Sequence, residues 1–176
     1  MNEELPQRKS PRLKGFDYSN SAYYFITICT DRKKIVFGNI ISTKMELNEK
    51  GIIINDCWNK LPDHFTNTEL DYYTIMPDHF HGIIILNGSV RLRSPQPSTA
   101  IKTATFSLSQ IIAYFKYQST KEINKIFGDG VNKIWQRSFY DRIIRNEHEL
   151  YQIRKYIEQN PTRWELDKSL PENLDV

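Results

Sequence analysis

The stretch LDYYTIMPDHFHGIIIL, residues 70–86, sets the fold class that the sequence predicts. It contains two β-prone runs, Leu70–Met76 and His79–Leu86, joined by Pro77 and Asp78, a pair suited to a tight turn. Aliphatic residues fill positions 83–86, so the second run is apolar on both faces, as in a central strand covered on both sides. The stretch therefore predicts an antiparallel hairpin near the centre of a sheet.

Strands and helices alternate on both sides of this hairpin. The other expected elements are a strand over 22–30, a helix over 53–65, a helix over 107–123, a strand over 139–145 and a helix over 147–159. Residues 48–51 are expected to form a break before the first helix, and Pro62 is expected to end or kink that helix. Ser107 and Gln110 form a capping box for the second helix. Pro161 is expected to stop the last helix.

This order of elements predicts an α+β fold of ferredoxin-like type, an antiparallel sheet with helices packed mainly on one face. A length of 176 residues without a shift in composition predicts a single domain, 1–176. Within it we expect a basic N-terminal arm over 1–20, a flexible loop over 87–105 and an acidic tail over 165–176.

The composition indicates a cytoplasmic protein with no membrane partner. Cys29 and Cys57 are the two cysteines, and their apolar neighbours predict reduced packing residues of an intracellular protein. The polar, charged N-terminus is unlike a secretory signal. No apolar run approaches the ~18 residues that a membrane span requires.

The net charge of +3 is too small to identify a binding partner, but the charged residues are unevenly distributed along the chain. No Asp or Glu lies between Asp78 and Glu122, and further basic residues gather at 8–14 and 137–155. Basic segments around a site for a polyanion have this pattern. A solvated surface has it as well.

A His-x-His pattern in the central strand is the first feature that carries chemistry. Residues two apart in a strand share a face, so His79 and His81 can reach one metal ion while Phe80 points into apolar packing. Two histidines do not complete a metal site, and a third ligand must come from elsewhere. Surface or hydrogen-bonded histidines are the alternative interpretation.

The last helix carries the second feature. Tyr156 and Asn160 are four residues apart, so they lie on one flank of the buried stripe that Leu150, Ile153 and Ile157 form. The alternative is that Tyr156 is a packing residue and that Asn160 only ends the helix. If the tyrosine and asparagine face the histidines, a metal ion held by the two imidazole nitrogens and the Asn160 amide oxygen can coordinate a phosphate oxygen. A phenol needs help to lose its proton at neutral pH, and the metal, Arg154 or Lys155 could supply that help.

Several blocks of the chain, in order and at familiar spacing, resemble the one-tyrosine HUH transposases, and among them the group related to REP-associated tyrosine transposases. The blocks are RLKGFDYS (12–19), YFITICT (24–30), MPDHFHGII (76–84), IWQR (134–137), YDRIIRNE (140–147) and YIEQNP (156–161). The resemblance covers nearly the whole length and implies a fold of HUH endonuclease type.

The resemblance implies a role for each site residue. His79, His81 and Asn160 match the metal ligands, and Tyr156 matches the nucleophile. Family members attack a phosphodiester of single-stranded DNA at a hairpin, leave a 5′-phosphotyrosine and a free 3′-hydroxyl, and rejoin strands by the reverse reaction. The implied cofactor is a divalent metal, Mg²⁺ or Mn²⁺.

Several alternatives remain. Gln159 could replace Asn160 as a ligand, and Tyr140 and Tyr151 are neighbouring tyrosines. Relatives act as monomers or as homodimers that swap the tyrosine helix, and both a mobile element and a domesticated role fit the sequence. The alternative functions are a DNA or RNA hairpin-binding protein without cleavage and a metal-dependent phosphodiesterase that uses water.

Basic and aromatic residues then acquire an expected role. Tyr117 and Trp135 could stack on unpaired bases, whereas core packing is favoured for Tyr114. The expected DNA-binding residues are Arg12, Lys14, Arg91, Arg93, Arg154 and Lys155, with Lys102 beside them in the loop.

Overall fold

The computed structural model describes residues 22–87, 106–128 and 133–169. The elements in chain order are β1 (Ala22–Cys29), the 3₁₀ turn η1 (Asp31–Lys33), β2 (Gly38–Ile41), β3 (Lys44–Leu47), α1 (Glu49–Asn59), α2 (Leu61–His64), β4 (Thr68–Ile75), β5 (His79–Leu86), α3 (Leu108–Phe127), β6 (Tyr140–Ile144) and α4 (Glu147–Ser169). The expected basic arm with Arg12 and Lys14, and the expected loop with Arg91, Arg93 and Lys102, lie outside the described residues.

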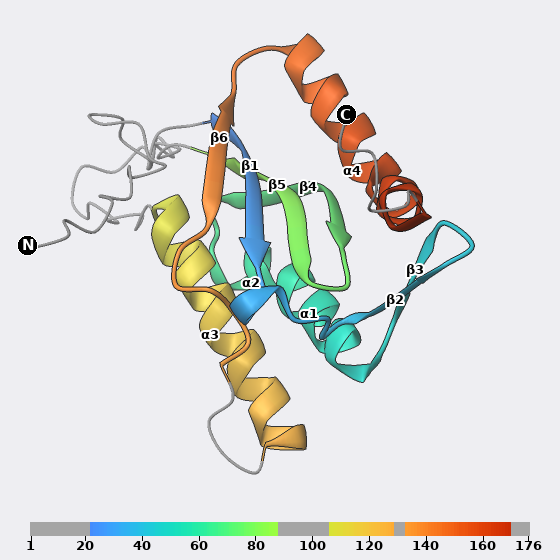
Figure 1. Cartoon of the computed structure of the whole chain (residues 1–176). Helices are drawn as coiled ribbons and strands as arrows, with labels where there is room; N and C mark the ends of the chain where they lie inside the picture. The colour runs from blue at the N-terminus through green and yellow to red at the C-terminus, as the bar shows by residue number, and fades with distance from the viewer. Residues whose placement is uncertain (1–21, 88–105, 129–132, 170–176) are drawn as a thin grey trace, which may run out of the picture.

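A four-stranded sheet in the order β4-β5-β1-β6 forms the centre of the structure (Figure 1). All three strand pairs are antiparallel, and β4 and β5 form the hairpin expected at residues 70–86. The backbone amide of Met76 donates to the His79 carbonyl at 2.8 Å across the Pro77-Asp78 turn. The predicted α+β fold with an antiparallel sheet is confirmed.

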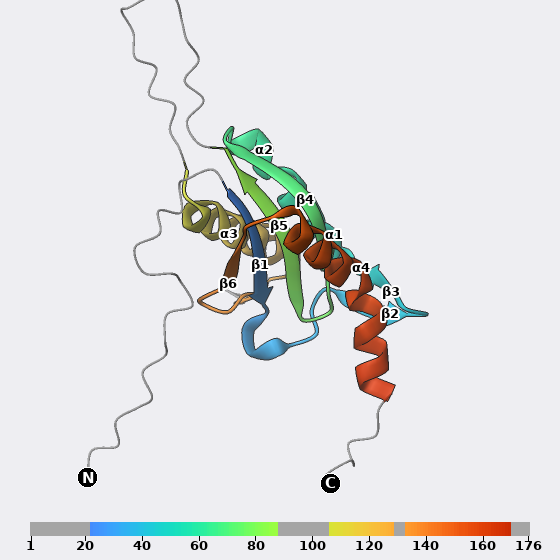
Figure 2. The same cartoon turned by 90° about the horizontal axis from the view of Figure 1, so that it is seen from above.

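Helices α1 and α3 cover one face of the sheet, whereas α4 crosses the other (Figures 1 and 2). Tyr24, Ile26 and Ile28 of β1 are fully buried towards α1 and α3, because alternate side chains of a strand point to the same face. On the opposite face Ile83 packs with Ile153 and other apolar residues of α4. Both faces of β5 are therefore covered, as its unbroken aliphatic run predicts.

The main core lies directly beneath the His-x-His pattern. Phe80 points away from the face of the two histidines and packs on Trp58, with ring centroids 4.6 Å apart, and on Phe115 at 5.5 Å. Gly82 leaves room for this packing, since a Cβ there would meet the Trp58 ring at 2.9 Å. Burial of these large rings fixes β5, and with β5 the positions of His79 and His81.

The β2–β3 hairpin was not expected from the sequence. Its turn residues Ser42 and Thr43 both have positive φ, +49° and +62°, as in the two-residue turns that Asn-Gly or Asp-Gly usually form. Ser-Thr lacks that signature, so nothing in the local sequence marks the turn. The Glu165 carboxylate of α4 accepts a hydrogen bond from the Thr43 backbone amide at 2.6 Å, which ties the hairpin to α4.

The first helix begins earlier than predicted. Residues 48–51 are not a break, because Asn48 is the N-cap of α1 and its side chain accepts a hydrogen bond from the Gly51 amide. Pro62 marks a break in the helix expected over 53–65, as predicted, because α1 ends at Asn59 and α2 begins at Leu61. It lies in the first turn of α2, where a missing backbone donor costs nothing.

The predicted stop at Pro161 is wrong, because α4 continues through it to Ser169. Proline removes one backbone hydrogen bond and bends a helix, and tertiary contacts can compensate for that loss. Trp164 supplies such a contact by packing on the His79 ring, with centroids 5.8 Å apart. Figures 1 and 2 show α4 changing direction along its length.

None of the helices in the described part of the chain has the length and apolar character needed to cross a bilayer.

Cys29 and Cys57 are half-buried free thiols, and burial raises the pKa of each above its ordinary value.

Candidate metal and nucleophile site

The imidazoles of His79 and His81 lie side by side on the sheet face that α4 crosses, with ring centroids 4.6 Å apart. Each ring has one nitrogen engaged by a neighbour. The His79 Nδ1 atom lies 2.5 Å from the Asp78 carboxylate, and the His81 Nδ1 atom lies 2.8 Å from the Thr27 hydroxyl. Partners of this kind fix the orientation of metal-binding histidines and leave Nε2 available to an ion.

His81 is deeply buried and electrically neutral. Burial lowers its pKa from 6.5 to about 3, and the neighbouring His79 contributes to the shift. Phe25 of β1 stacks on the His81 ring at a centroid distance of 5.4 Å. A neutral imidazole held in this way has the protonation state that metal binding requires.

Helix α4 brings Tyr156 to the histidines. The Tyr156 hydroxyl lies 3.5 Å from His81 Nε2, and the two ring centroids are 5.3 Å apart. Phe25 packs edge-on against the Tyr156 ring at 6.0 Å. The Arg163 guanidinium lies over the same ring at 5.5 Å and places a positive charge beside the phenol.

Asn160 occupies the middle of a row along α4. Tyr156, Asn160 and Trp164 are four residues apart, so they follow one another on one flank of the helix. Tyr156 contacts His81 and Trp164 contacts His79, which places Asn160 opposite the histidine pair. Asn160 is 7% exposed, whereas Gln159 is exposed to solvent. This difference favours Asn160 over Gln159 as the group that faces the site.

The residues present fit a divalent ion. Within residues 22–87, 106–128 and 133–169, no cluster of three or more His, Cys, Asp or Glu side chains could hold a metal. Among these described residues, a third protein ligand beside His79 and His81 would therefore be of another type. The buried amide of Asn160 is such a group, and imidazole nitrogens with an amide oxygen suit divalent ions, Mn²⁺ included.

Two polar contacts, on either side of Tyr156, join α4 to β4 and to the β2–β3 hairpin. Arg154 donates two hydrogen bonds to the Asp71 carboxylate of β4, at 3.0 and 2.5 Å, and its guanidinium lies over the Tyr72 ring at 5.3 Å. The contact between Glu165 and Thr43 lies beyond Asn160. Bidentate pairs of Arg with a carboxylate are geometrically specific, so the Arg154–Asp71 pair sets the position of α4 relative to β4.

The structure thus brings His79, His81 and Tyr156 into contact, and Asn160 is buried one helical turn after Tyr156 on the same flank of α4. Arg154 is paired with Asp71, Lys155 is exposed, and a role of either in DNA binding stays a prediction. Of the other tyrosines, Tyr151 is 60% exposed on α4, and Tyr140 lies on β6, two strands away from His81.

Sequence reasoning missed four residues that shape the site: Thr27, Asp71, Arg163 and Trp164. Thr27 is the cross-strand partner of His81, and Asp71 sits at an irregularity in the pairing of β4 with β5. Trp164 and Arg163 lie beyond Pro161, where no helix was expected. A four-residue spacing continued through Pro161 is the one signal that could have found Trp164.

The stability of the metal-free protein is expected to fall in mild acid because of His81. The unfolded chain takes up a proton on this imidazole below about pH 6.5, whereas the folded chain does so only near pH 3. The free energy of unfolding should therefore fall by about 1.4 kcal/mol per pH unit within that window. Urea unfolding of wild type and His81→Gln, both with chelator, measures this effect. Parallel losses of stability in the two proteins would contradict it.

Similarity to known proteins extends over most of the chain. No protein-family model matches it. An uncharacterised protein of Haemophilus influenzae is 35% identical over 175 residues, which cover 95% of each chain. Among solved structures, that of a REP-associated tyrosine transposase bound to a REP hairpin has a TM-score of 0.59 and 18% identity. The match covers 87% of this chain and 74% of the transposase. The fold is therefore transposase-like, and the chain belongs to the same family as the Haemophilus influenzae protein.

Proposed function

We propose that this protein is a single-stranded DNA endonuclease and strand transferase of the one-tyrosine HUH type. One observation carries the proposal: the Tyr156 hydroxyl points at Nε2 of His81, 3.5 Å away, in a chain with a transposase-like fold. The Thr27 hydroxyl engages Nδ1 of His81, so the nitrogen that faces the phenol is the one left for an ion, and a metal bound there would lie next to the Tyr156 oxygen.

The proposed reaction is a transesterification at phosphorus. The Tyr156 oxygen bonds to phosphorus, the bond from phosphorus to the 3′ oxygen breaks, and the products are a 5′-phosphotyrosine and a 3′-hydroxyl. The phenol gives up its proton, and the leaving 3′ oxygen takes one up. Because one phosphodiester replaces another, the reverse attack by a 3′-hydroxyl rejoins strands without an external energy source.

Each site residue has one task in this proposal. His79, His81 and Asn160 would hold a divalent ion, Mg²⁺ or Mn²⁺, which when bound would polarise the phosphate towards attack. Thr27 and Asp78 orient the two imidazoles. The Arg163 guanidinium lies over the Tyr156 ring, where it could contact the phosphate under attack. His81 and Tyr156 meet within one chain, which supports a site assembled from a single copy.

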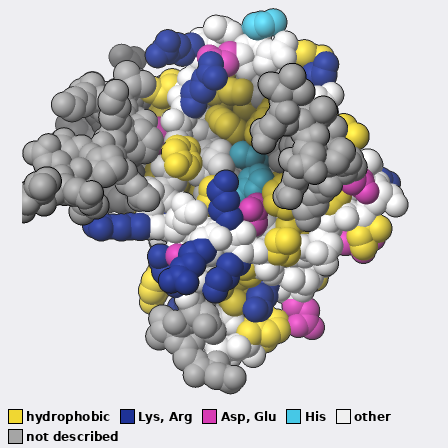
Figure 3. All heavy atoms as spheres, viewed as in Figure 1, with side chains coloured by type: hydrophobic (Ala, Val, Ile, Leu, Met, Phe, Trp, Pro, Cys, Tyr) yellow, Lys and Arg dark blue, Asp and Glu magenta, His cyan; other side chains and the backbone are white. Residues whose placement is uncertain are grey.

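The proposed substrate is a DNA hairpin with a single-stranded flank. The solved transposase of similar fold is bound to a REP hairpin, which supports this class of partner. The surface of the protein agrees with a polyanionic partner. In Figure 3, histidine side chains are visible near the middle of one face, and lysine and arginine side chains gather beside and below them.

The proposal predicts a covalent complex between protein and DNA. The protein is incubated with Mn²⁺ and single-stranded oligonucleotides that carry the hairpins found around its own gene. The products are separated on a denaturing protein gel. We expect a slowly migrating adduct that forms with Mn²⁺ and is absent with chelator.

The other outcomes separate the alternatives. Tight hairpin binding without cleavage, unaffected by metal, would identify a hairpin-binding protein. Cleavage that leaves no DNA on the protein would identify a metal-dependent phosphodiesterase in which water attacks.

A further inference from the structure

A groove lies between α3 and the segment 133–137, which precedes β6 and pairs with the end of β1. Its volume is about 420 Å³, and its lining includes Tyr117, Lys121, Lys133, Trp135 and Arg137. None of these residues belongs to the candidate metal and nucleophile site. The groove has an aromatic and aliphatic floor with basic residues around it.

The outer wall of the groove is held rigidly. Trp135 is buried, and its ring nitrogen donates to the Ser119 hydroxyl of α3 at 2.9 Å. The Lys116 ammonium donates to the backbone carbonyls of Gln136 and Arg137 at 2.5 and 2.9 Å. At the other end of the segment, Lys133 pairs with Asp31 at 2.6 Å. The wall is therefore formed before any ligand arrives, which lowers the entropic cost of binding.

Cationic groups at the groove are available to a ligand. Lys116 bonds to backbone carbonyls and Lys133 pairs with Asp31, whereas the side chains of Lys121 and Arg137 are exposed to solvent. Neither of these two has an acidic partner within residues 22–87, 106–128 and 133–169. Uncompensated cations beside a preformed groove fit an anionic ligand such as a phosphate backbone.

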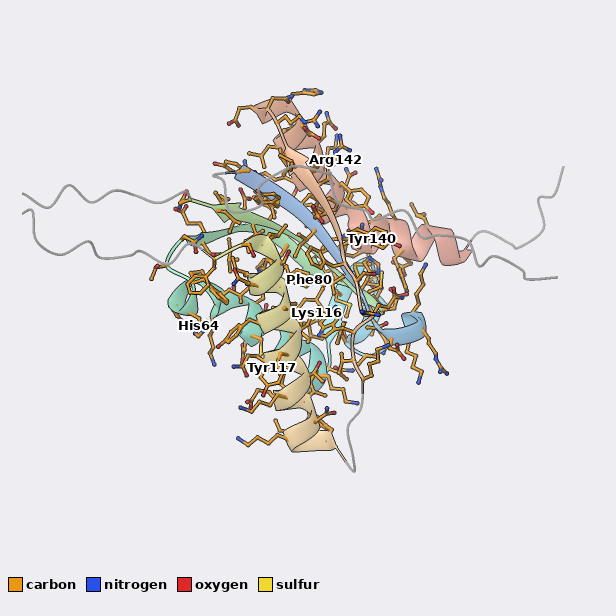
Figure 4. All side chains as sticks on the ribbon, turned by 90° about the vertical axis from the view of Figure 1, so that its left-hand side faces the viewer. His64, Phe80, Lys116, Tyr117, Tyr140 and Arg142 are labelled. Atoms are coloured by element: carbon orange, nitrogen blue, oxygen red, sulfur yellow. The ribbon has the colours of Figure 1, made fainter. Side chains whose placement is uncertain are left out.

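Exposed tyrosines lie along the same side of the molecule. Tyr117 of α3 is 64% exposed and Tyr140 of β6 is 60% exposed. Figure 4 shows both, with Lys116 and Arg142, on the side where β6 ends the sheet. Large exposed aromatic rings beside cations are the combination that single-strand-binding proteins use to stack bases and hold phosphates. A duplex offers no exposed base faces to such rings.

The groove is close to the reactive site. The Gln136 amide donates to the Cys29 carbonyl at 2.9 Å, and Cys29 pairs with His79 across β1 and β5. The wall segment is thus two strand spacings from the histidine strand, about 10 Å. Tyr140 pairs with Thr27, the residue that also pairs with His81, so its side chain lies on the sheet face of the two histidines, on the edge strand that follows the groove segment.

We propose that this groove and Tyr140 hold the single-stranded DNA that flanks the cleaved phosphodiester, with Lys121 and Arg137 on phosphates and Tyr117 and Tyr140 under bases. This inference rests on the proposed function, because it extends the substrate path from the same site. It assigns to the groove the recognition of unpaired flanking nucleotides, separate from recognition of the hairpin stem.

The test measures DNA affinity by fluorescence anisotropy. All proteins carry Tyr156→Phe, so that no reaction occurs. The probes are a hairpin with single-stranded extensions on both sides and the same hairpin without extensions. Lys121→Ala with Arg137→Ala should reduce the slope of log affinity against log salt by about 1.4 for the extended probe, at about 0.7 per single-strand phosphate contact. Tyr117→Ala and Tyr140→Ala should each weaken its binding about tenfold.

Matched variants control for nonspecific loss of charge or aromatic surface. Lys60→Ala removes an exposed lysine next to α1, and Tyr151→Ala removes an equally exposed tyrosine of α4. Both should bind the extended probe as the parent does. The hairpin without extensions should bind the groove variants and the parent equally.

Two results would overturn the inference: groove variants that bind the extended probe normally, or equal losses on both probes, which would indicate a contact with the stem. Its failure can be distinguished from failure of the proposed function. If wild type forms the covalent adduct but the groove variants bind normally, the groove assignment alone is wrong. If no adduct forms but the groove variants bind the extended probe weakly, the nuclease assignment alone is wrong.

Discussion

Replacing Tyr156 by phenylalanine is expected to abolish the covalent adduct between protein and DNA, with a fall in cleavage rate of at least about 10⁴-fold. The substitution removes the oxygen that bonds to phosphorus. It retains the ring that packs edge-on against Phe25 and lies beneath Arg163. The variant should therefore fold and bind DNA as wild type does. Rates are measured from the amount of adduct on denaturing gels, and affinity from anisotropy with the hairpin probe.

Tyr151→Phe is the matched control for this prediction. Tyr151 lies on the same helix but is 60% exposed, and we expect Tyr151→Phe to form adduct at the wild-type rate. Tyr140→Phe should also retain the reaction, since a phenylalanine ring still stacks on bases. An adduct that persists in Tyr156→Phe and disappears in one of these two variants would assign the nucleophile to the other tyrosine.

Replacing His81 by alanine is expected to remove both Mn²⁺ binding and adduct formation. His81 supplies one of two imidazole ligands in the proposed site, and its Nε2 atom is the one that faces Tyr156. Loss of a direct ligand should exceed the 10–100-fold loss typical of a residue that only orients a ligand. Thr27→Val, which removes the hydroxyl next to His81 Nδ1, should show that smaller loss. Calorimetric titration with Mn²⁺ measures both.

The same titration decides between Asn160 and Gln159 as the third ligand. We expect Asn160→Ala to weaken Mn²⁺ binding by about tenfold or more and Gln159→Ala to leave it unchanged, because Asn160 is buried on the flank of α4 that carries Tyr156, whereas Gln159 is exposed. The reverse result would move the ligand to Gln159. Equal affinity in His81→Ala and wild type would remove the metal from the proposal altogether.

Local patterns predicted much of the fold because strands and helices have fixed side-chain periods. The hairpin of β4 and β5, the capping box of Ser107 and Gln110, and the placement of Phe80 opposite the histidines all follow from residues close together in sequence. Prediction from local sequence failed where long-range contacts stabilise a backbone conformation that the local residues disfavour. Ser42 and Thr43 adopt positive φ without glycine in a hairpin tied to Glu165, and α4 passes through Pro161 with Trp164 packed on His79.

The sequence by itself determined which groups can share a face: His79 with His81 on the strand, and Tyr156 with Asn160 on the helix. These pairings depend only on the two-residue period of a strand and the near-four-residue period of a helix. Only the tertiary structure decided that the histidine face of β5 meets the tyrosine face of α4. It also decided that Asn160 rather than Gln159 is buried, and that Arg154 pairs with Asp71 of β4. Those outcomes depend on how α4 packs across the sheet, and that packing joins residues more than seventy positions apart in the chain.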